Sequence, residues 1–89
     1  MAFLAFTPNL ARHVQVPAGR WAGRTVAEVL REAFRLHPRA RGYVLDDAGG
    51  LREHVTVFVN GHQITDRVHL AHPVSDDDEI YVMQALSGG

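Results

Sequence analysis

The chain has 89 residues, of which 46% are hydrophobic and 21% are charged, and its formal net charge is -1. A chain this short forms one domain with a modest core, and its nearly neutral charge gives no indication of binding to nucleic acid or to an anionic membrane. It contains no cysteine, which excludes disulfides, thiol nucleophiles and cysteine-ligated zinc, and all nine of its basic residues are arginine.

The sequence contains no run of about 20 apolar residues, the length that a membrane-spanning helix needs. Residues 1–10 lack the basic start and the long apolar stretch of a secretory signal. We therefore expect a cytoplasmic location.

The N-terminal segment has the pattern of a β-hairpin. Residues 2–7 are apolar, include two Phe and stop at the turn signal Pro8-Asn9, which predicts a first strand. Residues 13–16 alternate polar and apolar side chains before Pro17, which predicts the return strand.

An amphipathic helix is predicted next. Thr25 and Glu28 form a capping-box pattern at its start, and His37-Pro38 marks its end, because the residue before proline avoids helical backbone angles. The apolar residues between them are spaced for one face of a helix: Val26, Val29, Leu30, Ala33 and Phe34.

Residues 39–50 are polar and rich in glycine, and we expect a long connection that holds one short ordered piece at 43–45. In the strand predicted over residues 54–59, Thr56 and Phe58 face away from the valines at 55, 57 and 59. Asn60-Gly61 then predicts a hairpin turn.

A brief strand is expected at 62–64, a loop over 66–78 and a last strand over 79–85. In that last strand Ile80 and Val82 share one face, and Tyr81 and Met83 share the other. The fold class is therefore α+β: a ubiquitin-like β-grasp domain in which one main helix lies across one face of a mixed sheet of four or five strands. We expect this domain to span residues 1–86 and a flexible tail to span 87–89.

Residues 55–89 carry a resemblance to a known family. They contain a valine-rich strand that ends in Asn-Gly, a variable loop, an acidic turn, a last apolar strand and a final Gly-Gly. These features, in this order, resemble the C-terminal half of the MoaD/ThiS sulfur carriers. The chain departs from the family pattern at Gln84, where Pro is frequent, at Tyr81, where small residues are frequent, and at Asp77-Asp78, where one residue is usually Gly.

The resemblance implies a carrier protein, not an enzyme, although it could serve as the small subunit of a sulfur-transferring synthase. The Gly89 carboxylate would be adenylated by an E1-like, ATP-dependent partner and converted to a thiocarboxylate. That partner would use ATP and a sulfur donor, so the chain itself would bind no cofactor. Gly88, Ser87 and Leu86 would form the reactive tail, in which Leu86 is the last side chain able to anchor it on a partner.

A sulfur-accepting synthase subunit is the second expected partner. Its product could be molybdopterin, cysteine, thiamin, a siderophore or a thiolated tRNA, and the sequence leaves these open, although the chain length mildly favours the molybdopterin or cysteine groups. Two other functions also stay open: a ubiquitin-like modifier that is conjugated through Gly89, and a β-grasp interaction module with an inert tail.

Phe58, Tyr81 and Met83 are predicted to form an exposed apolar surface for these partners on the sheet face away from the helix. The alternatives are scattered surface residues or a face covered by residues 39–50.

Other polar groups favour structural roles. The acidic cluster at 76–79 is typical of a solvated turn, with attraction of an Arg-rich partner surface or a metal ion as the alternative. The arginines at 31, 35, 39 and 41 suit the negative end of a helix, with contact to an acidic partner as the alternative. The six histidines show no convergence on a zinc site, so we predict no metal.

Overall fold

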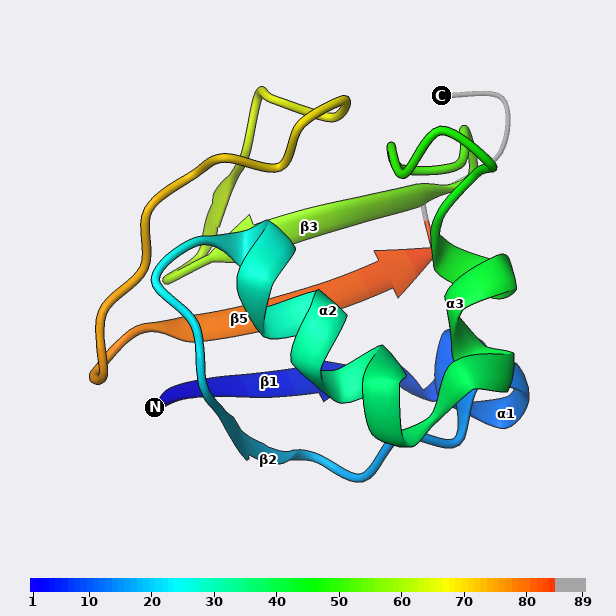
Figure 1. The fold of residues 1–89 in the computed structure, drawn as a ribbon, viewed down its shortest axis with the longest axis horizontal. Helices are drawn as coiled ribbons and strands as arrows, with labels where there is room; N and C mark the ends of the chain where they lie inside the picture. Colours follow the sequence, from blue (N-terminus) through cyan, green and yellow to red (C-terminus); the bar gives the residue numbers. More distant parts are fainter. Residues whose placement is uncertain (85–89) are drawn as a thin grey trace.

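The computed structural model describes residues 1–84, which form a five-stranded mixed sheet and three helices. The strands lie in the order β2-β1-β5-β3-β4 (Figure 1). β1 runs parallel to β5, and the other neighbouring strands are antiparallel. In chain order the elements are β1 (Ala2–Phe6), α1 (Pro8–Val14), β2 (Gly19–Trp21), α2 (Val26–Leu36), α3 (Pro38–Val44), β3 (Val55–Val59), β4 (His62–Gln63) and β5 (Glu79–Gln84).

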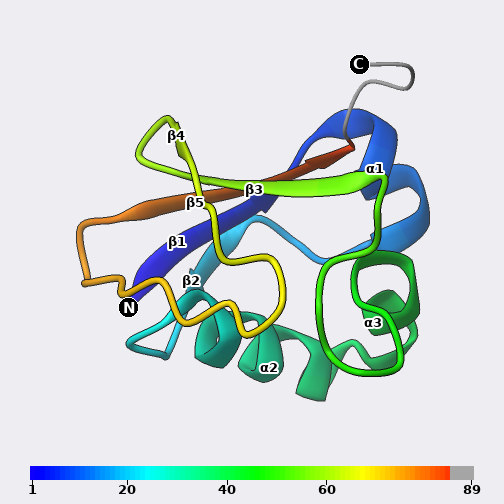
Figure 2. The same ribbon diagram turned by 90° about the horizontal axis from the view of Figure 1, so that it is seen from above.

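The core lies between the sheet and α2. Viewed from above, α2 and α3 lie on the same side of the sheet (Figure 2). The five apolar residues predicted for the buried face of α2 are all buried, as are Leu4, Val57, Ile80 and Val82 from the central strands. The predicted helix and the alternation in β3 and β5 are thus confirmed.

The start of α2 follows the capping-box pattern with one difference. The Oγ1 atom of Thr25 accepts a hydrogen bond from the Glu28 N–H at 3.1 Å. The Glu28 carboxylate accepts from the Arg24 N–H at 3.0 Å, one residue before the cap. The N–H groups of Glu28 and Arg24 are therefore satisfied, although the pattern would place the second bond on the N–H of Thr25.

The predicted N-terminal hairpin is wrong in its second strand. Residues 13–16 do not pair with β1, because α1 occupies Pro8–Val14 and the strand that returns is β2. Pro8 stands in the first turn of α1, where its fixed φ and its missing N–H carry no penalty. Leu10 and Val14 are buried on one side of α1 at the i, i+4 spacing of a helix.

The long connection predicted after α2 is also only partly right. α2 does end before Pro38, but Pro38 opens a second short helix, α3. Tyr43 and Val44 form the end of that helix, and Leu45 is its extended C-cap. Ala40 and Val44 are buried, and α3 packs against both α1 and α2.

The second half of the chain follows the prediction closely. Asn60 and Gly61 both have positive φ, 52° and 83°, in the turn between β3 and β4. β5 ends at Gln84, and the predicted last position of that strand, residue 85, lies outside the described residues. None of the helices within residues 1–84 has the length and apolar composition that crossing a membrane requires.

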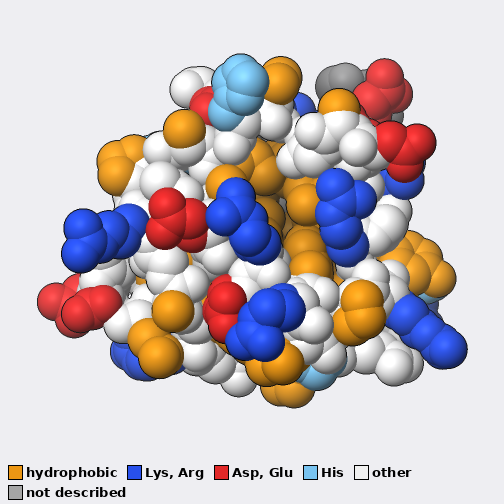
Figure 3. All heavy atoms as spheres, in the orientation of Figure 1, with side chains coloured by type: hydrophobic (Ala, Val, Ile, Leu, Met, Phe, Trp, Pro, Cys, Tyr) orange, Lys and Arg blue, Asp and Glu red, His pale blue; other side chains and the backbone are white. Residues whose placement is uncertain are grey.

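The face that carries α2 and α3 is uneven. In the space-filling view, basic side chains stand on either side of a hollow in which hydrophobic side chains are visible (Figure 3). Apolar surface is therefore open to solvent on this side of the molecule.

Candidate functional site

The predicted reactive residues Leu86, Ser87, Gly88 and Gly89 lie outside the described part of the chain. The structure instead defines the strand that leads to them. β5 is the central strand of the sheet, paired with β1 on one side and β3 on the other. Gln84, the last described residue, is paired with Val55 of β3, whereas β1 is paired with β5 only as far as Val82.

The predicted partner residues come together on the sheet face away from α2. Phe58 and Tyr81 are direct cross-strand partners, and Thr56 is the partner of Met83. Tyr81 is 36% exposed, and Phe58 and Met83 are half-buried. Residues 39–50 do not cover this face, because α3 lies on the side of α2 (Figure 2).

Phe3, which is not among the predicted partner residues, also belongs to this surface. Its ring centroid is 6.1 Å from that of Tyr81. The burial of Ala2, Leu4 and Phe6 on the core side of β1 puts Phe3 on the opposite face, so the alternation in the sequence carried this signal. We name the four residues Phe3, Phe58, Tyr81 and Met83 the outer-face cluster.

Beside the outer-face cluster, Thr56 is a buried polar residue with 6% exposure. Its Oγ1 accepts a hydrogen bond from the side-chain amide of Gln63 on the neighbouring strand, at 2.9 Å. The bond satisfies the hydroxyl group of Thr56. Gln63, on the short strand β4, is thus a polar residue at the border of the apolar cluster.

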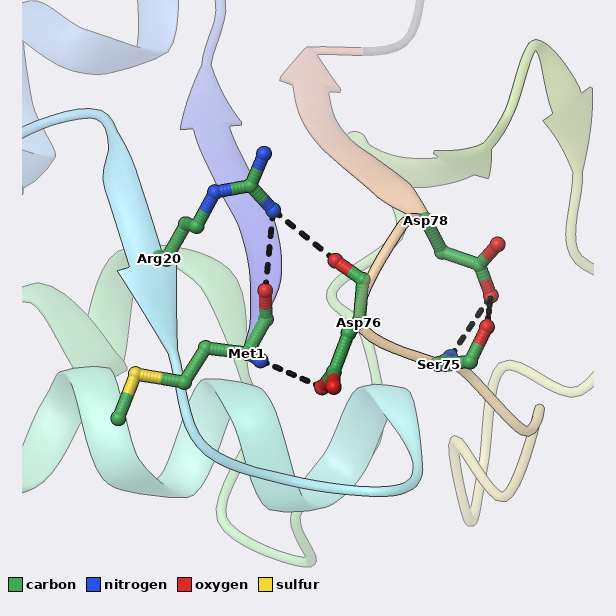
Figure 4. Close-up of polar contacts among 5 residues, drawn as sticks. All are labelled: Met1, Arg20, Ser75, Asp76 and Asp78. Carbon is green, nitrogen blue, oxygen red and sulfur yellow. Dashed lines mark hydrogen bonds and ion pairs between the residues drawn. The ribbon is translucent and has the colours of Figure 1, made fainter.

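The acidic turn before β5 is occupied by contacts within the chain (Figure 4). The Asp76 carboxylate pairs with the amine of Met1, and the Arg20 guanidinium donates to the carbonyl oxygens of both Met1 and Asp76. The bond from the Met1 amine is the main cause of a lowered pKa for Asp76. On the other side of the turn, Asp78 accepts from the Ser75 N–H at 2.8 Å. These contacts tie the turn before β5 to the first residue of the chain and to β2.

Two histidine side chains contact aromatic rings. His13 stacks on Tyr43 with ring centroids 5.4 Å apart, and His37 meets the ring of Trp21 edge-on at 6.0 Å. Across residues 1–84, no three side chains of the metal-binding types converge on one point.

The fold assigns the protein to a structural class. A mixed five-stranded sheet with parallel central strands and a helix across one face is the ubiquitin-like β-grasp arrangement, and the predicted fold class is confirmed.

The sequence then gives the family. The family model described as "ThiS family" matches residues 19–89, which include the final two glycines. The chain therefore belongs to the ThiS family of small ubiquitin-like carrier and modifier proteins, which are generally not enzymes. The resemblance seen in residues 55–89 is confirmed at this level.

Solved structures agree on the fold. The chain is similar to one in the Amycolatopsis orientalis BexX/CysO complex, with 20% identity, a TM-score of 0.81 and full coverage of both chains. CysO of Mycobacterium tuberculosis is 18% identical with a TM-score of 0.80, over 97% of this chain and 100% of that one. SAMP1 of Haloferax volcanii is 24% identical with a TM-score of 0.75, over 99% and 98%. No curated protein gives a significant match.

Proposed function

We propose that this protein is a cytoplasmic sulfur carrier that holds sulfur as a thiocarboxylate on Gly89. The observation that carries the proposal is the family match, which extends through residue 89 and so includes Gly88 and Gly89. The position of β5 gives further support, because a central strand provides a rigid base a few residues before Gly89.

The chemistry requires activation of the Gly89 carboxyl group. A terminal carboxyl has a pKa of about 3.3 to 3.7, so it is an anion near neutral pH and a poor electrophile. An E1-like partner would let this carboxylate displace pyrophosphate from ATP and form an acyl adenylate. Attack by hydrosulfide would then release AMP and leave the thiocarboxylate. A persulfide donor would form an acyl disulfide first, and a thiol would then release the thiocarboxylate from it.

The glycines suit this reaction. Gly89 has no Cβ, so its carbonyl carbon is open to a nucleophile, and two successive glycines let the backbone enter a narrow active site. Leu86 would anchor the tail on the activating enzyme. The sulfur would then pass to a synthase subunit in the formation of molybdopterin, cysteine or a related product.

The outer-face cluster is proposed as the docking surface for these partners. Tyr81 and Met83 lie on β5 itself, so a protein bound there would be close to the point at which the tail begins. The cluster is apolar and includes three aromatic or sulfur-containing side chains that are only half-buried, which is typical of the centre of an interface.

The experiment that tests the carrier function measures intact mass. The chain is incubated with ATP, an E1-like activating enzyme of the same pathway and sodium sulfide. We expect a mass increase that equals the replacement of one oxygen atom by sulfur, dependent on ATP and absent when Gly89 is deleted. An unchanged mass with an enzyme that does form acyl adenylate on the chain would contradict the proposal.

The lack of cysteine makes a second readout possible. Because the chain has no thiol of its own, an alkylating reagent such as iodoacetamide should label the carrier only after the reaction, on the new sulfur atom. Digestion should place the label on the peptide that contains Gly89. The Gly89 deletion should keep the melting temperature of the full chain, since a terminal glycine has no side chain to pack.

Conjugation to other proteins is the second candidate, favoured by the similarity to a small archaeal modifier protein. It would join Gly89 to an amine of a target. Trypsin cuts after Arg67, the last basic residue, so a conjugated target lysine would keep residues 68–89 as a branch. Such branched peptides from cells, absent in a Gly89 deletion strain, would establish conjugation.

A further inference from the structure

The hollow on the α2 side of the molecule is a groove of about 510 Å³, within the size range of ligand-binding sites. It lies between α2, α3 and two loops, residues 46–50 and 66–72. Its inner part is lined by buried apolar residues, Leu30, Phe34, Leu45 and Leu70. The outer-face cluster lies across the sheet from it, so the groove is a separate surface.

The rim of the groove is positively charged. Arg31, Arg35, Arg41 and His69 line it, and none of its lining residues is acidic, although the chain has more acidic than basic residues if the histidines are neutral. Arg35 is paired with Glu32. Within residues 1–84, Arg31 and Arg41 have no carboxylate partner, so their charges are available to a ligand. Basic residues stand on both sides of the hydrophobic floor (Figure 3).

One wall of the groove is held in place by the side chain of Asp66. Its Oδ1 accepts from the N–H groups of Val68 and His69, at 3.2 and 2.9 Å, and its Oδ2 accepts from that of Ala71 at 3.0 Å. These backbone bonds, led by the one from Ala71, lower the pKa of Asp66. The result is a loop whose conformation is fixed by one carboxylate.

Leu70 fixes the same wall to the core. Its φ is 52°, a left-handed value that costs free energy for a leucine, and its side chain is only 1% exposed. Its carbonyl oxygen accepts from the Ala27 N–H in the first turn of α2 at 2.9 Å. The burial and the hydrogen bond hold this residue in place, while the nearby Val68 is 66% exposed at the rim.

A second wall, formed by residues 46–50, lies beside the first and is organised in the same way by Asp46. Its Oδ1 accepts from the N–H groups of Ala48 and Gly50, at 2.9 and 3.0 Å. Both walls are therefore formed before any ligand arrives. A preformed site loses little conformational entropy on binding, which favours affinity.

We propose that this groove binds an acidic peptide segment of a partner protein. One large apolar side chain of the segment would lie on the floor, and its carboxylates would accept hydrogen bonds from Arg31 and Arg41, a geometry for which guanidinium groups are well suited. A hydrophobic floor and a net charge of -1 disfavour a nucleic acid, whose binding depends on many phosphate contacts. Because the groove and the outer-face cluster lie on opposite sides of the sheet, both surfaces can be occupied at once.

The test uses fluorescence anisotropy with the unmodified full chain and no activating enzyme, so its result is independent of the reaction at Gly89. The probe is a fluorescein-labelled peptide of Asp and Glu residues around one central Phe. Two comparison peptides carry Lys in place of the acids, or Ala in place of Phe. We expect both comparison peptides to bind at least about tenfold more weakly than the probe.

Substitutions test which residues bind the acidic peptide. Arg31→Glu combined with Arg41→Glu should weaken binding of the acidic peptide by about tenfold or more, and Val68→Ser should weaken it by a smaller factor. Arg12→Glu makes the same kind of charge change on α1, outside the groove, and should leave the affinity unchanged. Circular dichroism should give the same spectrum for all of them, since these side chains are exposed.

Amide chemical shifts give the position directly. Changes on addition of the acidic peptide should centre on Ala48, Val68 and His69. Any of four results would overturn the proposal: no binding of the acidic peptide, equal binding of the basic one, shifts centred on Phe58 and Tyr81, or tighter binding of a single-stranded oligonucleotide.

Discussion

Asn60 and Asp78 connect the turn after β3 to the start of β5: the Nδ2 of Asn60 donates to Oδ1 of Asp78 at 2.8 Å, while the Oδ1 of Asn60 accepts from the Glu79 N–H at 2.9 Å. One side chain thus joins two segments that are far apart in the sequence. Asn60 also has a left-handed φ of 52°, which asparagine tolerates better than most residues.

Replacing Asn60 with Ala should lower the free energy of unfolding by about 2 to 3 kcal/mol, since two hydrogen bonds are lost and a left-handed alanine is strained. Asn60→Gly is the matched control, because glycine accepts the φ value and loses only the hydrogen bonds. Urea unfolding should place Gly between the wild type and Ala. Equal stability of the two variants would show that backbone strain has no part in the effect.

Stability should fall in acid because of hydrogen-bonded carboxylates. The pKa values of Asp66 and Asp78 are both lowered from 3.8, by bonds led by those from the Ala71 N–H and the Asn60 side chain respectively. A carboxyl group whose pKa is lower in the folded state contributes stability above its unfolded pKa, and this is lost as pH falls through its folded pKa. The loss should begin near about pH 4 and continue below it.

Asp66→Asn tests the contribution of one of these groups. The variant should be less stable than the wild type at neutral pH and should lose less stability between about pH 6 and pH 2, because it cannot be protonated. Asp47→Asn removes a charge that makes no side-chain hydrogen bond within residues 1–84, and should follow the wild-type curve. Parallel curves for Asp66→Asn and the wild type would contradict the assignment.

Two glycines should respond in opposite ways to replacement by alanine. A Cβ on Gly23 would lie 2.6 Å from the backbone nitrogen of Val29 and 2.8 Å from its Cγ2, and Gly23 has a φ of 149°. Gly23→Ala should therefore destabilise the protein by about 2 kcal/mol or more.

Gly42 lies in α3, and a Cβ added there would have no neighbouring atom within 4 Å, so Gly42→Ala should stabilise by about 0.5 to 1 kcal/mol. Thermal unfolding of the two variants side by side gives the comparison. A loss of stability in Gly42→Ala would mean that the backbone of α3 at residue 42 does not have regular helical geometry.

Substitutions of two tyrosines test whether the outer-face cluster is the docking surface. Tyr81→Ser should lower the rate of thiocarboxylate formation by about tenfold through loss of an interface contact, with little change in stability. Tyr43, which is 47% exposed against 36% for Tyr81, lies on α3 and stacks on His13. Tyr43→Ser should leave the rate unchanged, and equal effects of both would argue against docking on the outer face.

The parts of the fold that could be predicted from the sequence are those with a long or strict pattern. The valines of β3, the alternation in β5 and the five apolar positions of α2 each repeat often enough to define a period. α1 and α3 have only seven residues each, too few for a clear period, and each opens with a proline that also marks a turn. Their packing against each other, which stabilises such short helices, cannot be read from local sequence.

The candidate sites can likewise be divided into a part that the sequence predicts and a part that it does not. The shared face of Phe58, Tyr81 and Met83 is predictable because successive side chains of a strand point to opposite faces of the sheet. Phe3 could have been added by the same reasoning. The groove could not be predicted. Leu45 and Leu70 come from segments without a regular period, and the left-handed backbone of Leu70 depends on its burial against α2.

The position of β5 between β1 and β3 determines when the sheet can form during synthesis of the chain. The ribosome produces β1 first and β5 last of the described strands, yet β1 contacts β3 in the sheet only through β5. A nascent chain therefore cannot close its central sheet until residue 84 has been synthesised and has emerged, and pairings so distant in sequence form slowly. On the proposed function, an activating enzyme would therefore find no folded scaffold on a polypeptide that lacks β5.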